Sequence, residues 1–156
     1  MKKIITILTL LSWTLFVEAQ TEKQTMSDID KATTEIKSKL DIYTKVEKHT
    51  SADGYKFVFL NDKEIKVIIV KSIEPTIEKN VEWYYVNGTL SYCETNWVDI
   101  KSKKVVKHEK HYLNNGHLIA WVNIDNKLVE NTSSEFKKLD DELNAYGTKL
   151  KSDALK

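Results

Sequence analysis

Three histidines that lie close together are the residues of this sequence that most directly suggest chemistry. His108 and His111 belong to the run His108-Glu109-Lys110-His111, and His117 follows shortly afterwards. Imidazole nitrogens bind zinc, and the zinc-protease motif places two histidines on one face of a helix. Here the pattern is that of a strand, whose successive side chains point to opposite faces. We therefore predict no metal or other cofactor, and keep a small metal-dependent hydrolase that uses the three histidines as an alternative.

The single cysteine, Cys93, is the other candidate for catalysis, as the nucleophile of a thiol-dependent hydrolase. A reactive thiol needs a base beside it in space, whereas a cysteine in a β-rich run is expected to be a small buried apolar residue. The chain has no Gly-x-Ser-x-Gly elbow and no glycine-rich phosphate loop before a helix. It also lacks arginine, the residue that best grips phosphates and base edges. We predict a protein that is not an enzyme and binds no nucleic acid.

Aromatic side chains concentrate in the middle of the chain. Alternation along a strand places Trp83 and Tyr85 on one face, which we expect to be core, and Tyr84 on the other. Exposed Trp and Tyr are favoured at binding surfaces, although cross-strand aromatic pairs can also simply stabilise a sheet. We predict a binding module for a protein, a peptide or a glycan on an open sheet face. The predicted ligand-binding residues are Tyr84, Trp97, Tyr112 and Trp121. An inhibitor or immunity-type partner protein is a further alternative.

Two amphipathic helices are expected to flank these strands. Apolar residues recur every three or four positions over residues 25–48 and again over residues 133–151, which is the helical period. The segment Thr132-Ser133-Ser134-Glu135 has the form of a capping box, with the hydroxyl of Thr132 first and Glu135 three residues later.

Between the helices, β-rich runs over residues 55–124 predict six strands. Asn87-Gly88 and Asn115-Gly116 separate such runs, and Asn-Gly favours the type I′ turn of a hairpin. Short connections favour an antiparallel meander. The predicted fold is therefore α+β and two-layered: a six-stranded antiparallel meander with both helices on one face and the other face open.

The two hairpin tips, Tyr84–Leu90 and Tyr112–Leu118, share an aromatic residue followed by Asn-Gly-x-Leu. On this motif the chain resembles uncharacterised small secreted proteins of Bacteroidetes, in which a signal peptide precedes a helix, an antiparallel sheet and a final helix. It is less similar to MORN-like repeats, whose units of this kind stack into sheets. Neither resemblance implies a catalytic residue.

Residues 1–19 have the three-part pattern of a cleavable secretory signal. Lys2 and Lys3 precede an apolar run over residues 4–17, and Val17 and Ala19 occupy the positions that signal peptidase reads. The run is shorter than the roughly 20 residues of a spanning helix. We predict an exported protein, periplasmic or extracellular, whose residues 20–156 form one domain without stable membrane insertion. The whole chain has a net charge of +1, so no bulk field attracts nucleic acid or an anionic membrane.

Overall fold

The computed structural model describes residues 22–51 and 54–154. Residues 22–38 form an N-terminal helix. Seven strands and a second helix follow: β1 (Thr44–Ser51), β2 (Gly54–Asn61), β3 (Glu64–Ile73), β4 (Ile77–Val86), β5 (Thr89–Asp99), β6 (Val105–Asn114), β7 (His117–Val122) and α2 (Ser134–Asp153). The predicted signal over residues 1–19 lies outside the described residues. Within the described part, neither helix combines the length and apolar character needed to cross a membrane.

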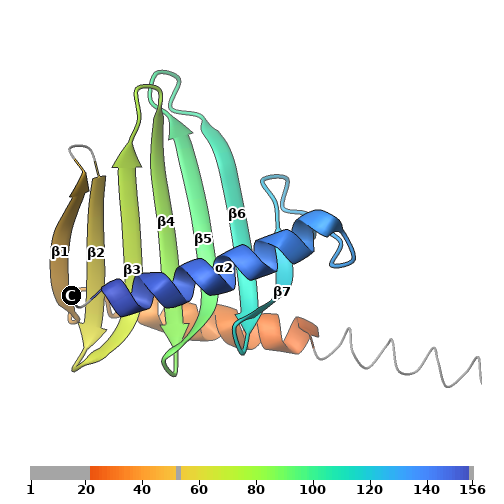
Figure 1. Cartoon of the computed structure of the whole chain (residues 1–156), viewed down its shortest axis with the longest axis horizontal. Helices are drawn as coiled ribbons and strands as arrows, with labels where there is room; N and C mark the ends of the chain where they lie inside the picture. The colour runs from red at the N-terminus through yellow and green to blue at the C-terminus, as the bar shows by residue number, and fades with distance from the viewer. Residues whose placement is uncertain (1–21, 52–53, 155–156) are drawn as a thin grey trace, which may run out of the picture.

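The strands form one antiparallel sheet in the order of the sequence, which confirms the α+β meander with a helix at each end (Figure 1). The sheet has seven strands, so the prediction of six is wrong. The additional strand, β1, begins at Thr44, inside the segment 25–48 that was predicted to be wholly helical. Val46 lies three residues after Tyr43 and so fits a helical stripe, but in β1 it pairs with Val58 of β2 and packs against the core. The helical spacing of apolar residues therefore does not decide the structure here, because this segment forms a strand by pairing with β2.

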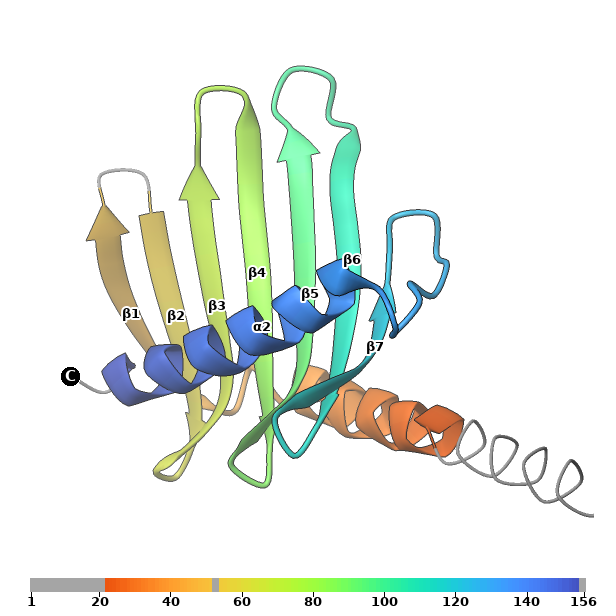
Figure 2. The ribbon, with the colours of Figure 1, turned by 45° about the vertical axis from the view of Figure 1, so that its right-hand side comes forward.

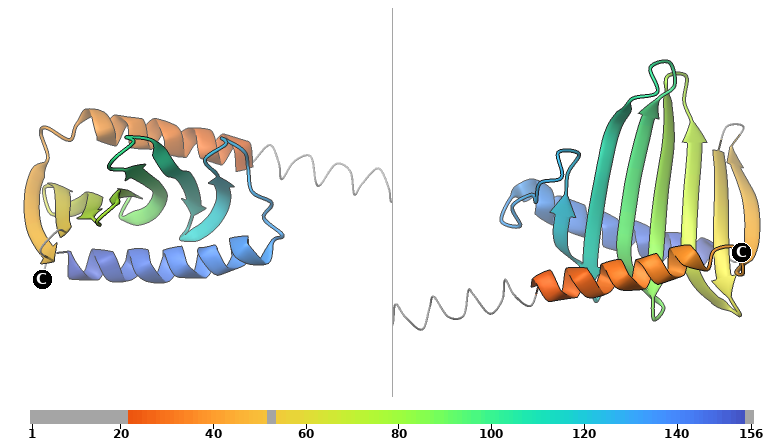
Figure 3. Two further views of the ribbon diagram at one scale, coloured as in Figure 1. Left: turned by 90° about the horizontal axis from the view of Figure 1, so that it is seen from above. Right: turned by 180° about the vertical axis from the view of Figure 1, so that it is seen from behind.

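The two helices lie on opposite faces of the sheet, as the view from above shows (Figure 3). The α2 face buries Val58, Ile68, Trp83, Tyr85, Leu113 and Leu118 against Phe136, Leu143 and Leu150. The other face buries Val67, Tyr84, Tyr92, Tyr112 and Ala120 against Ile29 and Ile36 of the N-terminal helix. The two-layer prediction is therefore wrong, because both sheet faces carry apolar residues and each needs its own cover.

Both helices cross the strands near the end that holds the Asn-Gly turns, and the strands β3–β6 continue beyond them (Figures 1 and 2). We call this projecting part of β3–β6, which ends in the turns between β3 and β4 and between β5 and β6, the distal half of the sheet. In both views, neither helix crosses the far ends of these four strands.

The turns and the cap follow local sequence. Asn87 and Gly88 have φ of 50° and 75°, as a type I′ turn requires, and Asn115 and Gly116 have 52° and 83°. The predicted C-terminal helix is confirmed, but its cap is Ser133 and not Thr132. The hydroxyl of Ser133 accepts a hydrogen bond from the Phe136 N–H at 3.1 Å.

Candidate functional site

Strands β4 and β5 place three pairs of identical residues opposite one another. Tyr84 pairs with Tyr92, Glu82 with Glu94, and Asn80 with Asn96. All six side chains belong to the face of the N-terminal helix, because alternate residues of a strand share a face and Tyr84 and Tyr92 are packed there. The tyrosines lie under the helix, and the glutamates and asparagines follow in the distal half. Going away from the helix along this face, the side chains therefore change from aromatic to carboxylate to amide.

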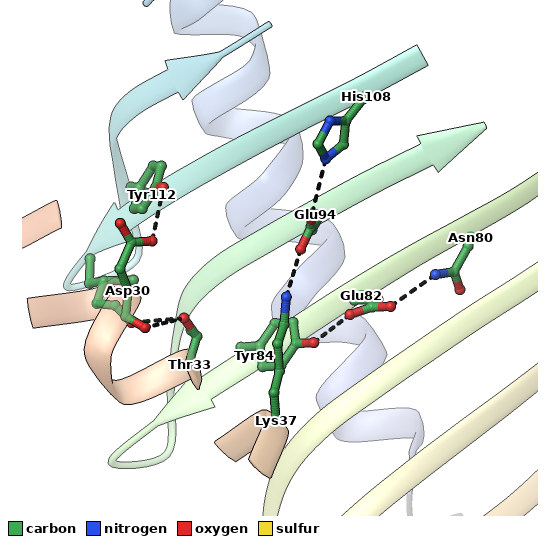
Figure 4. Close-up of polar contacts among 10 residues, drawn as sticks. Asp30, Thr33, Lys37, Asn80, Glu82, Tyr84, Glu94, His108 and Tyr112 are labelled. Carbon is green, nitrogen blue, oxygen red and sulfur yellow. Dashed lines mark hydrogen bonds and ion pairs between the residues drawn. The ribbon is translucent and has the colours of Figure 1, made fainter. Parts of the chain in front are cut away.

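Glu82 is held in place by its own strand (Figure 4). The Tyr84 hydroxyl donates a hydrogen bond to Glu82 Oε2, and Asn80 Nδ2 donates to Glu82 Oε1 at 2.9 Å. Burial, followed by the hydrogen bond to Glu82, raises the pKa of Tyr84, so its hydroxyl remains a donor over the physiological pH range.

Glu94 is held from two other elements. Lys37 of the N-terminal helix contacts Glu94 Oε2 at 2.8 Å, and His108 Nε2 of β6 lies 3.0 Å from Glu94 Oε1. Burial alone would raise the pKa of Glu94, but the hydrogen bonds from Lys37 and His108 outweigh it and lower the pKa. Glu94 is therefore an ionised acceptor and is unsuited to the role of general acid near neutral pH.

A cavity of about 370 Å³ opens beside these groups. We call it the polar cup; its lining residues are Lys37, Asn80, Glu82, Glu94, Asn96, Val105 and His108. The volume lies toward the lower end of the range for small-molecule sites. Asn80 Oδ1 is buried and has no hydrogen-bond partner among the described residues. Since buried polar atoms are nearly always paired in proteins, this oxygen is an acceptor that still lacks a donor.

The N-terminal helix forms one wall of the polar cup and is anchored by polar contacts. Lys37 Nζ lies 5.1 Å from the centre of the Tyr84 ring and also forms the ion pair with Glu94. About two turns earlier in the same helix, Asp30 Oδ1 accepts a hydrogen bond from the Tyr112 hydroxyl at 2.9 Å. The cup is therefore complete only while this helix is docked.

The four aromatic residues predicted to bind a ligand do not share a face. Tyr84 and Tyr112 are buried beneath the N-terminal helix, with exposed fractions of 0% and 4%. The expectation that Tyr84 faces outward is wrong, because that helix covers its side of the sheet. Trp97 and Trp121 lie on the α2 face and are partly buried. A role of these two tryptophans in ligand binding stays a prediction.

The histidines are separated, as the strand pattern indicates. His108 pairs with Asn96 at the polar cup, whereas His111 is buried on the α2 face, where its ring lies 6.0 Å from that of Trp121. His117 begins β7 near Asp140 of α2, at 3.5 Å. In the part of the chain that the structure describes, no three His, Cys, Asp or Glu side chains are arranged to hold a metal ion.

Cys93 is fully enclosed in the core on the α2 face. Burial raises the pKa of its thiol, so the thiolate that a nucleophile requires is disfavoured. Among the described residues, neither the histidines nor Cys93 belong to an assembled catalytic set, and the alternative of a thiol- or metal-dependent hydrolase stays a prediction.

Sequence reasoning missed Lys37, Asn80, Glu82, Glu94 and Asn96. A usable signal is present, because Asn80-x-Glu82-x-Tyr84 is mirrored by Tyr92-x-Glu94-x-Asn96 around the Asn87-Gly88 turn. A hairpin folds such a mirror onto itself, so each residue meets its own kind. Lys37 carries no such signal, since its partner Glu94 is reached only through the docking of the helix.

Comparisons with known proteins complete this description. No family model, no curated protein and no solved structure matches the chain.

Proposed function

We propose that the protein is an exported binding module whose polar cup holds a small, uncharged polyhydroxyl ligand, such as one sugar unit of a glycan. The observation that carries this proposal is the buried, unpaired Asn80 Oδ1 in a cavity whose two carboxylates are already fixed by other groups. Fixed acceptors and donors lower the ordering free energy that a ligand must overcome on binding.

The charges around the cup favour a neutral ligand. Glu82 and Glu94 are accompanied by Lys37, and Lys110 lies directly opposite Glu94 on the same face. A cation or an anion would therefore meet groups of both signs. The lining of the polar cup offers carboxylate and amide oxygens as acceptors, and amide and ammonium groups as donors. A ligand hydroxyl can both donate and accept a hydrogen bond, and so matches both kinds of group.

A direct titration tests the proposal. Glucose, galactose, mannose and N-acetylglucosamine are added to the protein while backbone amide NMR signals are followed. At least one sugar is expected to shift the signals of residues 80–82 and 94–96, with a dissociation constant in the millimolar range, about −4 kcal/mol. Asn96→Ala should weaken that binding about fivefold, since each amide hydrogen bond contributes roughly 1 kcal/mol.

The matched control is Glu78→Gln. Glu78 is exposed on the same face of the sheet as Asn96, on the neighbouring strand β4, and does not line the cup, so this variant should bind like the unmodified protein. The proposal is overturned if none of the four sugars shifts these signals, or if both variants weaken binding equally. Release of nitrophenol from p-nitrophenyl glycosides would show that the protein hydrolyses glycosides and does not only bind them. The two opposed carboxylates could catalyse this reaction only if one of them were protonated.

The alternative of an inhibitor or immunity-type partner protein stays a prediction. Capture of one protein in stoichiometric amount from a periplasmic or culture extract, at a surface away from the cup, would favour it.

A further inference from the structure

The α2 face carries a second, chemically different cavity. A groove of about 560 Å³ lies between Trp83 of β4 and one flank of α2. Its lining is mostly apolar and comprises Trp83, Leu139, Leu143, Ala145 and Tyr146, together with Glu142 and Lys149. This volume is within the range of small-molecule sites, which are mostly apolar with a few placed polar groups. The groove and the polar cup lie on opposite faces of the sheet.

Trp83 lines the groove and carries an unpaired polar atom. Its side chain is buried, with an exposed fraction of 5%, yet its indole Nε1 has no hydrogen-bond partner among the described residues. A buried indole N–H normally finds an acceptor. Gly147 allows α2 to approach this part of the sheet, since a Cβ there would lie only 2.5 Å from Leu90 Cδ2, with Trp83 Cε3 next to it at 3.7 Å. The helix backbone thus comes close to the indole ring without supplying an acceptor for its N–H.

Tyr146 forms the outer wall of the groove. Its ring centre lies 5.1 Å from that of Trp83 at an angle of 42°, and half of the residue is exposed. An exposed aromatic ring tilted over a buried one offers a planar or aliphatic molecule contact on two sides. The only charged lining residues, Glu142 and Lys149, have opposite signs, so the groove selects for neither an anion nor a cation.

We propose that this groove binds a neutral, largely apolar small molecule that accepts a hydrogen bond from Trp83 Nε1 through a carbonyl or ether oxygen. The apolar body of the ligand lies between Tyr146 and Leu143, and its single acceptor satisfies the unpaired indole. This site is independent of the polar cup, which takes a polar ligand on the other face.

Two probes that differ only in the acceptor test this assignment: acetophenone has a carbonyl oxygen and ethylbenzene has none. Both are titrated into the protein while the indole N–H and the methyl NMR signals are followed. Both should shift the methyl signals of Leu139 and Leu143, but only acetophenone should move the Trp83 indole N–H signal downfield. This measurement needs no variant.

A matched pair of variants then measures the hydrogen bond. Trp83→Phe keeps an aromatic ring and removes the donor; Trp97→Phe removes another buried, unpaired indole N–H that does not line the groove. The ratio of the two dissociation constants, ethylbenzene over acetophenone, should fall about 2- to 12-fold in Trp83→Phe, the range for one hydrogen bond. It should be unchanged in Trp97→Phe.

Three results would overturn the proposal: neither probe shifts the groove signals, both probes move the Trp83 indole signal equally, or the two variants change the ratio alike. A loss of sugar binding at the cup leaves this inference intact, because the two titrations report on different residues.

Discussion

Glu82 and Glu94 lie directly opposite each other on β4 and β5, and both side chains face the N-terminal helix side of the sheet. Like charges at opposed positions of an antiparallel pair are about 5 Å apart at Cβ and destabilise a sheet. The pairing persists because Tyr84 and Asn80 hold one carboxylate and Lys37 and His108 hold the other. Where a local rule of stability is broken with such compensation, a functional site is the usual reason.

Replacing Glu94 by Gln should destabilise the protein by about 1 kcal/mol at neutral pH, because the half-buried ion pair with Lys37 is lost. The contacts lower the folded-state pKa of Glu94 from its ordinary value of 4.5. The stability they contribute is therefore present above about pH 4.5 and is lost as the pH falls below it. Urea unfolding at about pH 7 and about pH 3 should show the difference between variant and unmodified protein shrinking in acid. Glu78→Gln, the exposed control on the neighbouring strand β4, should show no such trend; an equal destabilisation of Glu94→Gln at both pH values contradicts the prediction.

Replacing Lys37 by Met should loosen the N-terminal helix. Met keeps most of the apolar stem but removes the charge that reaches Glu94 and lies over the Tyr84 ring. Amide hydrogen exchange over residues 22–38 should become faster, by up to about tenfold, while the core of α2 is unaffected. Lys39→Met is the control, because Lys39 follows the helix directly, is exposed, and forms its ion pair with Glu35 of the helix and not with the sheet. If both variants accelerate exchange equally, the contact with Glu94 does not anchor the helix.

Replacing Gly147 by Ala should destabilise the protein, although Ala is favoured in a helix by about 1 kcal/mol. A Cβ at this position would lie 2.5 Å from Leu90 Cδ2, and the carbonyl of Gly147 accepts a hydrogen bond from the Tyr85 hydroxyl at 3.0 Å. Overpacking of this kind costs about 1–3 kcal/mol, so we expect a net loss of about 1 kcal/mol in thermal or urea unfolding. Combined with Leu90→Val, the loss should be less than additive. A gain in stability would show that α2 shifts without penalty.

Replacing Ser133 by Ala should cost about 1 kcal/mol of unfolding free energy, because the first turn of α2 loses its side-chain acceptor. Replacing the neighbouring exposed Thr132 by Ala should change stability by less than about 0.5 kcal/mol. The two variants differ by one position, so chemical denaturation of both separates the observed cap from the one expected from sequence. Equal losses would mean that Thr132 takes part in the cap.

The thiol of Cys93 should be inert in the folded protein. Burial raises its pKa and shields it from reagents. Dithionitrobenzoate at mildly alkaline pH should therefore react with less than about a tenth of the thiol on the time scale in which denatured protein reacts completely. Rapid reaction of the folded protein would favour the thiol-dependent hydrolase alternative.

Much of the fold could be predicted because its signals are local. The Asn87-Gly88 and Asn115-Gly116 turns need positive φ at both residues, and Asn-Gly tolerates this. The α2 stripe is visible as a helical period. The prediction failed at β1, where Val46 fits both a helix and a strand and only its pairing with Val58 decides.

The polar cup was harder to predict because its residues come from separate elements. The mirror of Asn80, Glu82 and Tyr84 in β5 can be read from the sequence, but Lys37 reaches Glu94 only because the N-terminal helix lies on that face. Tyr84 was expected outside for the same reason: alternation shows that two residues face apart, and it does not show which helix covers each side.

The sequence by itself determined the order of the elements, the positions of the Asn-Gly turns and the separation of His108 from His111, because these follow from backbone preferences and from the two-residue period of a strand. Only the tertiary structure decided that the helices take opposite faces, that the distal half of the sheet extends beyond them, and that Lys37, Glu94 and His108 meet. Such contacts depend on how whole surfaces bury their apolar area against one another, and that is a property of the folded chain and not of any one segment.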